Sequence, residues 1–517
     1  MPYLVLRSLA LSTARTAREF SAAALLLASA LQALTLCQGC SSSFHTADSG
    51  PNSTPGSSAP PGSLSLAPAN ATVQQWQSIQ FTVSGEASNT SCAWTSSDPA
   101  ILVLIGGQGF QGMQVGNATV SATCGAQAAQ AIVAVIPQAA SGPVAITSGG
   151  TYSGNWNSDD PNTPAVSIET DDPVTIQDSV VASRGTLIRV SGVRNGANVT
   201  IENVTGMALD PQRPGAQRGA FVSASSIHSL DVDHCTMTGV SFGVSVTSSN
   251  VSALRILNDL AVNLEDRASD GSGGLEAARP ALGHFVLLSR IVAPQGGEIA
   301  WNQILQTMGQ SSVEDVINLF RSQGGPGRPI WVHDNYIEGN SSPSTPDNYT
   351  GTAILADGGR AEPVTAQAWF ADNEIVHTAG SGLAIDNGHD ITASGNRIVS
   401  CGQDGAGAWF AMSYANAASI WDFYGSGPSL FYNNTVTETA GGLVRPNVAG
   451  EPMAADFWGS ALSMTYPGNS SSGNDFTNPC LAGGSLNLSA EDAERAYWAA
   501  KVSASGVLIG DQHLGGQ

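Results

Sequence analysis

Two aspartates, each ending a short alternating strand, are the residues best spaced for chemistry. In Ile354-Leu355-Ala356-Asp357 and Leu383-Ala384-Ile385-Asp386, burial of the alternate apolar residues points both aspartates outward. On neighbouring parallel strands, about 4.8 Å apart, the two carboxylates come within roughly 5–7 Å of each other. That separation suits a shared cation such as calcium, or the acid and nucleophile of a glycosidase. Like charge at this range raises one pKa and favours an acid role.

The same strand register predicts further side chains around the two carboxylates. They are Asn318 and Phe320 on the preceding coil, Trp409 on the following coil, and Arg321, Arg360 and His389 at the rim. Phe320 and Trp409 offer aromatic planes to the C–H faces of sugar rings. Arg321 or Arg360 could serve as the base of a calcium-dependent lyase.

A structural interpretation of the same residues stays open. Asp357-Gly358-Gly359 and Asp386-Asn387-Gly388 are turn sequences, in which the aspartate caps the turn. Phe320 and Trp409 can lie under an insertion as a satellite core. The arginines can be salt-bridge partners on an acidic surface.

A repeated phrase predicts the elements that position these residues. It is apolar-x-apolar-x-x-Asn-x-apolar, and its clearest copies are 330–337, 369–375, 391–398 and 430–436. Each copy is too short for a helix, which indicates stacked β coils. The asparagine marks a turn that needs a left-handed residue, and stacked asparagines form a ladder. We expect Asn335, Asn373, Asn396 and Asn434 at successive corners.

With two or three strands per coil, this pattern resembles the right-handed parallel β-helix of the pectate-lyase-like superfamily over about 300 residues. The resemblance implies an all-β solenoid over residues 138–517 and is weak on activity. The lysine and arginine pair of some β-helix lyases is absent, and the aspartate motif of β-helix polygalacturonases is not reproduced. Ser489-Ala490-Glu491-Asp492 predicts a capping box and a helix to about Ala500, closing or flanking the last coil.

The first residues are typical of an export signal, assigned to residues 1–40. Three arginines precede an apolar run at 20–36, and Cys40 follows a small residue. A Ser, Pro and Gly linker occupies residues 41–62. This arrangement resembles a bacterial lipoprotein signal, which implies lipidation of Cys40. Ordinary cleavage and free secretion is the alternative.

Residues 63–137 alternate with period two, as expected of a small β-sandwich. Cys92, followed by Trp94, can pair with Cys124 in a cross-sheet disulfide. The segments 94–100 and 116–120 resemble bacterial immunoglobulin-like domains of the second Big group, which implies a spacer or adhesive module. The remaining cysteines of the repeats, Cys235, Cys401 and Cys480, are expected to be buried free thiols.

Charge limits the partners. The formal net charge is −22 and Lys501 is the single lysine, which excludes nucleic acid and anionic membrane faces. We expect an exported, monomeric surface protein, freely secreted or anchored in the cell envelope. Its β-helix is expected to bind a polysaccharide and cleave it by glycosidic hydrolysis. The alternatives are a non-catalytic glycan-binding or adhesive protein and a calcium-dependent polysaccharide lyase.

Overall fold

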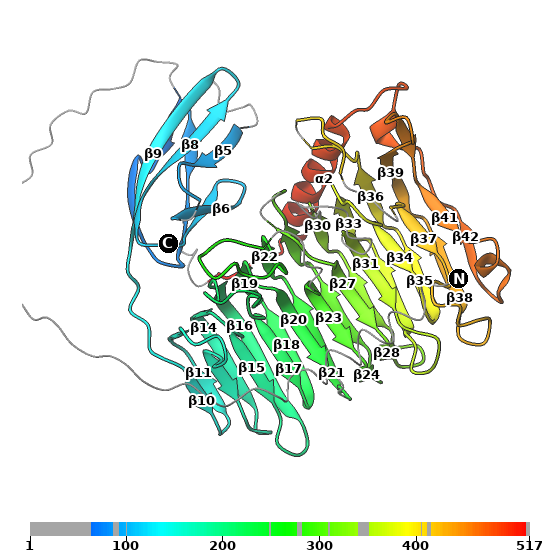
Figure 1. The fold of residues 1–517 in the computed structure, drawn as a ribbon, viewed down its shortest axis with the longest axis horizontal. Coiled ribbons are helices and arrows are strands. Elements are labelled where there is room, and N and C mark those ends of the chain that lie inside the picture. Colours follow the sequence, from blue (N-terminus) through cyan, green and yellow to red (C-terminus); the bar gives the residue numbers. More distant parts are fainter. Residues whose placement is uncertain are drawn as a thin grey trace, which may run out of the picture. The chain divides into compact units, whose positions relative to one another are not determined.

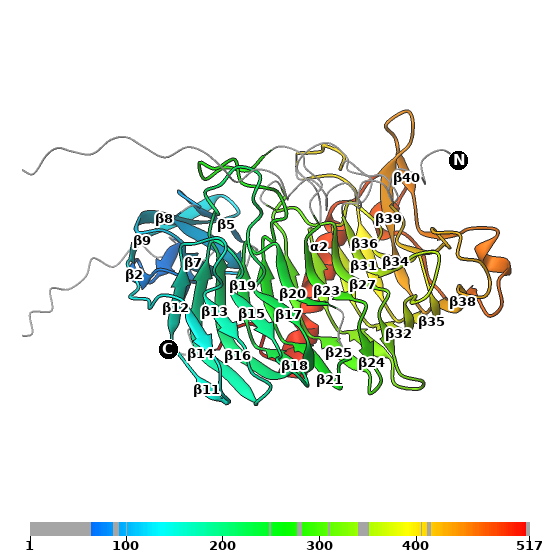
Figure 2. The same ribbon diagram turned by 60° about the horizontal axis from the view of Figure 1, so that its bottom comes forward.

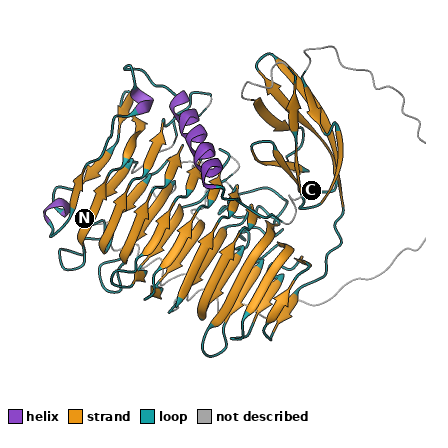
Figure 3. Ribbon diagram, turned by 180° about the vertical axis from the view of Figure 1, so that it is seen from behind, coloured by secondary structure: helices purple, strands orange, loops and turns teal. Residues whose placement is uncertain are grey.

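The computed structural model describes residues 64–85, 92–99, 101–247, 250–276, 282–308, 311–339, 351–404, 406–410 and 415–512. The predicted export signal with Cys40 and the predicted linker 41–62 lie outside these ranges. Strands dominate the described elements (Figure 1, Figure 3), and the predicted all-β class is confirmed. Within the described ranges, no helix has the length and apolarity that a membrane crossing requires.

The N-terminal domain is a β-sandwich whose last strand ends at Ile136. Its sheets have the orders β2-β9-β8-β5 and β3-β7-β6, with β1 paired to β4. The strands are β1 (Ser65–Ala67), β2 (Asn70–Gln74), β3 (Ser78–Gln80), β4 (Thr82–Ser84), β5 (Cys92–Ser96), β6 (Leu102–Gly106), β7 (Gly109–Gly112), β8 (Gly116–Cys124) and β9 (Gln127–Ile136). A disulfide joins Cys92 and Cys124. These cysteines face each other on neighbouring strands of one sheet, so the expected cross-sheet position is wrong.

The second domain is a parallel β-solenoid, as predicted, and its coils build three faces (Figure 1, Figure 2). Face 1 is an 11-stranded parallel sheet. Asp357 is the last residue of one of its strands, and Asp386 directly follows another. Its strands are β10 (Val144–Ile146), β13 (Val166–Ile168), β15 (Ile188–Ser191), β17 (Val222–Ser225), β20 (Phe242–Thr247), β23 (His284–Ser289), β27 (Asp315–Phe320), β31 (Thr352–Asp357), β34 (Leu383–Ile385), β37 (Ala418–Ile420) and β41 (Phe457–Gly459).

Faces 2 and 3 share one continuous sheet, because the long strands β14 (Val174–Ser183) and β16 (Ala197–Ala208) run through both. Face 2 continues with β11 (Gly150–Tyr152), β18 (Ile227–Asp233), β21 (Ala253–Leu257), β25 (Gly297–Ala300), β29 (Ile330–His333), β32 (Ala366–Ala371), β35 (His389–Ser394), β38 (Tyr432–Thr437) and β42 (Ser470–Ser472). Face 3 continues with β12 (Asn155–Ser158), β19 (Thr236–Thr238), β22 (Leu260–Val262), β26 (Gln303–Leu305), β30 (Tyr336–Glu338), β33 (Glu374–Val376), β36 (Arg397–Ser400) and β39 (Ala440–Pro446).

The remaining elements are short additions to the coils. They are β24 (Val292–Ala293), β28 (Gln323–Gly324), β40 (Pro452–Ala454), and the 3-10 helices η2 (Ser463–Thr465) and η3 (Pro479–Leu481).

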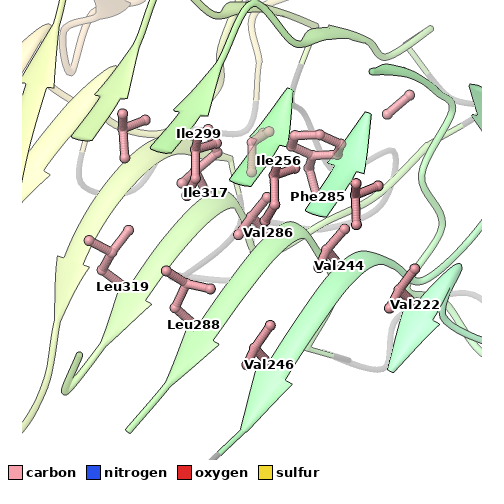
Figure 4. Close-up of a cluster of buried hydrophobic side chains, with 14 of the residues drawn as sticks. Val222, Val244, Val246, Ile256, Phe285, Val286, Leu288, Ile299, Ile317 and Leu319 are labelled. Atoms are coloured by element: carbon pink, nitrogen blue, oxygen red, sulfur yellow. The ribbon is translucent and has the colours of Figure 1, made fainter. Parts of the chain in front are cut away.

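Columns of apolar side chains fill the interior of the solenoid. Each strand sends alternate residues inward, and parallel register stacks the equivalent residues of successive coils. Two such columns from face 1 are Val244, Val286 and Ile317, and Val246, Leu288 and Leu319 (Figure 4). Burial of one such side chain is worth about 1.5–3 kcal/mol. The alternate residues on these strands therefore point away from the core.

An asparagine ladder runs along the corner between faces 2 and 3. The backbone N–H of Asn335 donates to Asn373 Oδ1 at 3.2 Å, and Asn335 Nδ2 donates to the same oxygen at 2.9 Å. Asn373 repeats both bonds to Asn396 Oδ1 at 3.1 and 2.9 Å. Asn302 begins this series one coil earlier. The predicted ladder therefore exists for Asn335, Asn373 and Asn396.

Two details of the prediction are wrong. The left-handed residue is the one before the asparagine: φ is 50° at Asp334 and 54° at Asp372. The asparagine follows in ordinary backbone and supplies the side-chain bonds. Asn434 lies inside β38, opposite Ile391, and Thr439 occupies the ladder corner of that coil. The copy at 430–436 is displaced because its first apolar residues, Leu430 and Phe431, belong to the turn before β38.

An aspartate replaces asparagine at one corner, which leads to a stability prediction. Asp259 Oδ1 accepts the N–H of Cys235 at 2.7 Å, but its buried Oδ2 has no hydrogen-bond partner among the described residues. Burial raises the pKa of Asp259 well above its usual range. Stability from the protonated form is complete below the unfolded pKa, about 3.9, and is lost as the pH rises through the folded value.

We therefore expect Asp259→Asn to raise the free energy of unfolding by about 1–3 kcal/mol at pH 8, because an amide donates where the carboxylate cannot. Urea unfolding at pH 4 and pH 8 measures this, and the gain should be larger at pH 8. If the variant is less stable than the wild type at pH 8, the carboxylate of Asp259 must have favourable hydrogen bonds in the native protein.

A C-terminal strap, residues 489–512, runs along face 3. Its helix α2 (Ser489–Ser505) is longer than predicted and has no side-chain cap, so the capping box is wrong. Trp498 of α2 stacks on Tyr336 with ring centroids 5.3 Å apart. Beyond the helix, Gly510 N donates to Asn258 O at 2.7 Å and Asp511 N donates to Thr236 Oγ1 at 2.9 Å. The strap therefore flanks many coils and does not close the last one.

A second disulfide joins Cys401 and Cys480, so the expectation of free thiols is wrong for this pair. Cys235 is a buried free cysteine, as expected. The Cys401–Cys480 bond lies in a small apolar cluster with Ala490 of the strap. It closes a segment between residues that are 79 positions apart. Such a loop restricts the unfolded chain strongly.

We expect Cys401→Ser with Cys480→Ser to lower the free energy of unfolding by about 2–5 kcal/mol. Thermal melting followed by circular dichroism is the measurement. Cys92→Ser with Cys124→Ser is the matched control, whose effect should be confined to melting of the sandwich. An unchanged solenoid transition in the first variant would contradict the prediction.

Candidate functional site

The candidate site is an outward column of side chains on face 1. Phe320 on β27 is the register partner of Asp357 on β31. Ala356 pairs with Ile385, and Asp386 N donates to Ala356 O at 3.1 Å, so Asp386 follows Asp357 on the next coil. Trp421 N donates to Ile385 O at 2.9 Å and takes the corresponding place on the coil after that. The structure thus brings the two aspartates to neighbouring coils.

Asp357 is held by hydrogen-bond donors from three segments. Its Oδ1 accepts the hydroxyl of Tyr424 at 2.5 Å and the N–H of Gly358 at 2.7 Å. Its Oδ2 faces Asn318 Nδ2 at 3.5 Å. These donors fix the orientation of the carboxylate. The bond to Gly358 is also what a turn-capping aspartate makes.

The surroundings of Asp386 disfavour its charged form. Burial of the carboxyl, followed by the negative charge of Asp357, raises the pKa of Asp386 well above its usual range. Surrounding protein displaces most of the water near this carboxyl, although a small part of the residue is exposed. Burial and the neighbouring charge of Asp357 therefore favour the protonated form of Asp386. One proton donor and one hydrogen-bonded acceptor on adjacent coils can perform acid–base chemistry.

A buried polar layer supports Asp357 from below. Asn318 Nδ2 donates to Asp315 Oδ2 at 2.9 Å as well as facing Asp357. Burial raises the pKa of Asp315 well above its usual range, with the charges of Glu314 and Asp357 adding to the effect. Burial lowers the pKa of His284 to about 4, so its neutral ring donates from Nδ1 to Asp315 O at 2.8 Å. Asn318 is thus a support for the aspartates.

A loop after β37 brings Tyr424 over the two aspartates. Asp422 builds the loop: its Oδ1 accepts from Ser426 N at 2.8 Å and its Oδ2 from Gly427 N at 2.8 Å. Gly427 has φ of 82°, which favours glycine there. Phe423 N donates to Asp386 O at 3.1 Å, which fixes the loop to the neighbouring coil.

Aromatic rings continue the site away from the aspartates. Trp421 contacts both Trp458 and Phe423 edge to face, each with centroids 4.8 Å apart. Trp458, on the last strand of face 1, is 39% exposed. On the other side, Phe320 lies near the guanidinium groups of Arg290 and Arg321, at 5.7 and 5.3 Å.

The predicted arginines lie near the site in different roles. The guanidinium of Arg321 packs at Gly359, and no described residue forms a hydrogen bond with its buried Nε. Arg360 is exposed and its Nε donates to Tyr424 O at 2.8 Å. Among the residues that the structure describes, neither arginine forms an ion pair with a carboxylate.

Two predicted residues lie elsewhere. Trp409 packs against the cluster around Cys401 and Cys480, as in the satellite-core alternative. His389 begins β35 on face 2, where its ring stacks on Tyr432 with centroids 4.5 Å apart. The place predicted for Trp409 is taken by Trp421, because the strand of that coil is Ala418–Ile420 and not the segment around Trp409.

Sequence reasoning missed Trp421, Tyr424, Trp458 and the buried Asp315. A signal was available for the first, because Ala418-Ser419-Ile420-Trp421 has the same alternation as Leu383-Ala384-Ile385-Asp386. The others follow from loop folding and strand register that short phrases do not reveal. In the described part of the chain, no group of three or more His, Cys, Asp or Glu side chains is arranged to hold a metal ion.

Comparison with known proteins identifies the N-terminal sandwich. Residues 62–135 match the model of the bacterial Ig-like domain (group 2). The Ig-like domain carries none of the site described above, which lies entirely on the solenoid. No curated protein matches the chain. An Ig-like domain followed by a parallel β-solenoid fits a surface protein.

Proposed function

We propose that this chain is an exported surface protein whose solenoid binds a polysaccharide on face 1 and hydrolyses its glycosidic bonds. The observation that carries the proposal is the position of Asp386, whose pKa is raised by burial, on the coil next to the hydrogen-bonded Asp357. Trp421 and Trp458 would contact sugar rings on one side of the aspartates, and Phe320 on the other. Export follows from the signal at 1–40, with a lipid anchor on Cys40 or free secretion.

Each aspartate has a distinct role in the proposed reaction. Asp386 donates its proton to the glycosidic oxygen as the C–O bond breaks. Asp357 attacks the anomeric carbon and forms a covalent glycosyl ester. Asp386, now ionised, removes a proton from water, which hydrolyses the ester and regenerates both groups. Adjacent parallel strands lie about 4.8 Å apart, which favours this retaining route over an inverting pair separated by about 6.5–9.5 Å.

A non-catalytic glycan-binding or adhesive protein is the second candidate. The hydrogen bond from Gly358 N to Asp357 Oδ1 favours it, because a turn cap needs no reaction. The calcium-dependent lyase remains the third alternative. Arg321 or Arg360 would be its base.

These candidates are tested by incubating the full chain, which we expect to be monomeric, with a panel of polysaccharides. New reducing ends without ultraviolet absorbance of unsaturated products are expected for the hydrolase. Both signals together, dependent on calcium, would indicate the lyase. Retention on a polysaccharide with neither signal would leave the binding protein and overturn hydrolysis.

A further inference from the structure

Face 2 carries two exposed tryptophans that the site on face 1 does not use. Trp331 on β29 is the register partner of Trp369 on β32. Their side chains are 37% and 40% exposed. The rings stack with centroids 5.5 Å apart and planes 18° apart, and Trp331 also stacks on His333 at 3.7 Å. The two exposed indoles and the buried imidazole of His333 thus form a stacked group on the regular strands β29 and β32.

The charges beside these rings are already paired within the protein. His333 Nε2 lies 3.2 Å from Glu298, and its Nδ1 lies 2.7 Å from Asp334. Lys501 Nζ binds Asp334 at 2.7 Å. Glu298 and Asp334 thus already have partners among the described residues, so neither favours a charged ligand. The surface therefore suits an uncharged partner.

Hydroxyl groups continue the column beyond Trp369. Thr392 is the register partner of Trp369, and Thr435 follows on the next coil. Their Oγ1 atoms lie 3.3 Å apart. These side chains are short, so they leave space beside the indole and present hydrogen-bonding groups. An apolar plane next to hydroxyl groups matches a sugar ring, which has C–H faces and hydroxyl edges.

The size of the apolar surface distinguishes a sugar from a protein partner. A stable protein interface buries about 800 Å² on each partner around an apolar core. Here two indoles are followed along the solenoid by threonines and preceded by Glu298 and Arg255. Such a narrow aromatic strip is too small for that core but covers one or two sugar rings.

We propose that Trp331, Trp369 and Thr392 form a second carbohydrate-binding surface that takes uncharged sugar units of the polymer bound at face 1. This inference rests on the proposed function for the identity of the polymer. The two surfaces lie on different faces of the same coils, because β31 and β32 are consecutive strands. Binding at face 2 retains the protein on an insoluble polymer and leaves cleavage at face 1 unaltered. Its role is to raise the effective substrate concentration.

The test uses the full chain and its Trp331→Ala/Trp369→Ala variant in pull-down isotherms on insoluble cellulose, xylan and mannan. We expect at least a tenfold weaker retention of the variant on the neutral polymer that the wild type binds. Trp369→Phe should recover most of the retention, since it keeps an aromatic plane. Tyr497→Ala, which removes another exposed aromatic residue, is the matched control and should bind like the wild type.

Turnover of a short soluble oligosaccharide separates this inference from the proposed function. The double variant should cleave it at the wild-type rate, whereas Asp386→Asn should retain polymer binding without cleavage. It is also possible to observe cleavage by neither the wild type nor any variant, together with weaker retention of the tryptophan variant. That result would support the binding surface and overturn the proposed hydrolysis. Equal retention of the double variant and the wild type on all three polymers, with unchanged melting, overturns the binding surface.

Discussion

Asp386→Asn should lower kcat on the cleaved polysaccharide by about 10²–10⁴-fold, the usual contribution of a general acid. Asparagine has nearly the same shape but cannot donate a proton to the glycosidic oxygen. The melting temperature of the Asp386→Asn variant should be equal to or above that of the wild type, because the substitution removes a buried carboxyl whose pKa is raised. Initial rates and thermal melting on the same preparations measure both effects.

The pH profile provides an independent check of the role of Asp386. The acid works when protonated, so kcat/KM should fall as the pH rises through its elevated pKa. Tyr424→Phe is a milder comparison, which removes one hydrogen bond to Asp357 and should cost about tenfold in kcat. If Asp386→Asn and Asp357→Asn both lower stability without a specific loss of turnover, the aspartates are turn caps.

Asn373→Leu should produce the largest loss of stability, about 3–5 kcal/mol. The substitution removes the oxygen that accepts both Asn335 donors and the amide that donates to Val332 O at 2.9 Å. The buried N–H groups of Asn335 on the neighbouring coil then have no acceptor. The leucine side chain fills the space, so a water molecule cannot take the place of the lost oxygen. Urea unfolding followed by circular dichroism is the measurement.

Two further variants define the cause of that loss. Asn195→Leu, at an exposed turn asparagine, should change stability by no more than about 0.5 kcal/mol. Asn373→Asp should resemble the natural corner at Asp259, with a loss that grows as the pH rises. A cost below about 1 kcal/mol for Asn373→Leu would mean that the ladder is not important for stability.

The fold could be predicted because its signals are local. Alternating strands and the corner asparagines recur within each coil, and both are properties of short segments. Asn434 was placed wrongly because an apolar turn before β38 imitates the phrase, while threonine stands at the true corner. The Cys401–Cys480 pairing depends on how the last coil meets the strap, which no local pattern contains.

The site was only partly predictable for the same reason. Asp357 and Asp386 follow strands of equal pattern, so alignment alone places them on neighbouring coils. The placement of Trp409 on face 1 is wrong because the apolar segment around it resembles a strand more closely than Ala418–Ile420, the short strand of small side chains that face 1 contains. Tyr424 reaches Asp357 through a folded loop, whose path depends on hydrogen bonds to Asp422.

The strap changes how the solenoid must come apart. In an open array of repeats, each coil contacts its two neighbours, and the terminal coils fray one at a time. Here residues 489–512 are attached at two distant coils. Glu494 of the strap binds Arg397 of β36, and Asp511 accepts a hydrogen bond from Thr205 of β16. Loss of an end coil therefore strains a segment attached to the far coils. The strap couples distant repeats into one cooperative unit, so progressive fraying gives way to a single transition.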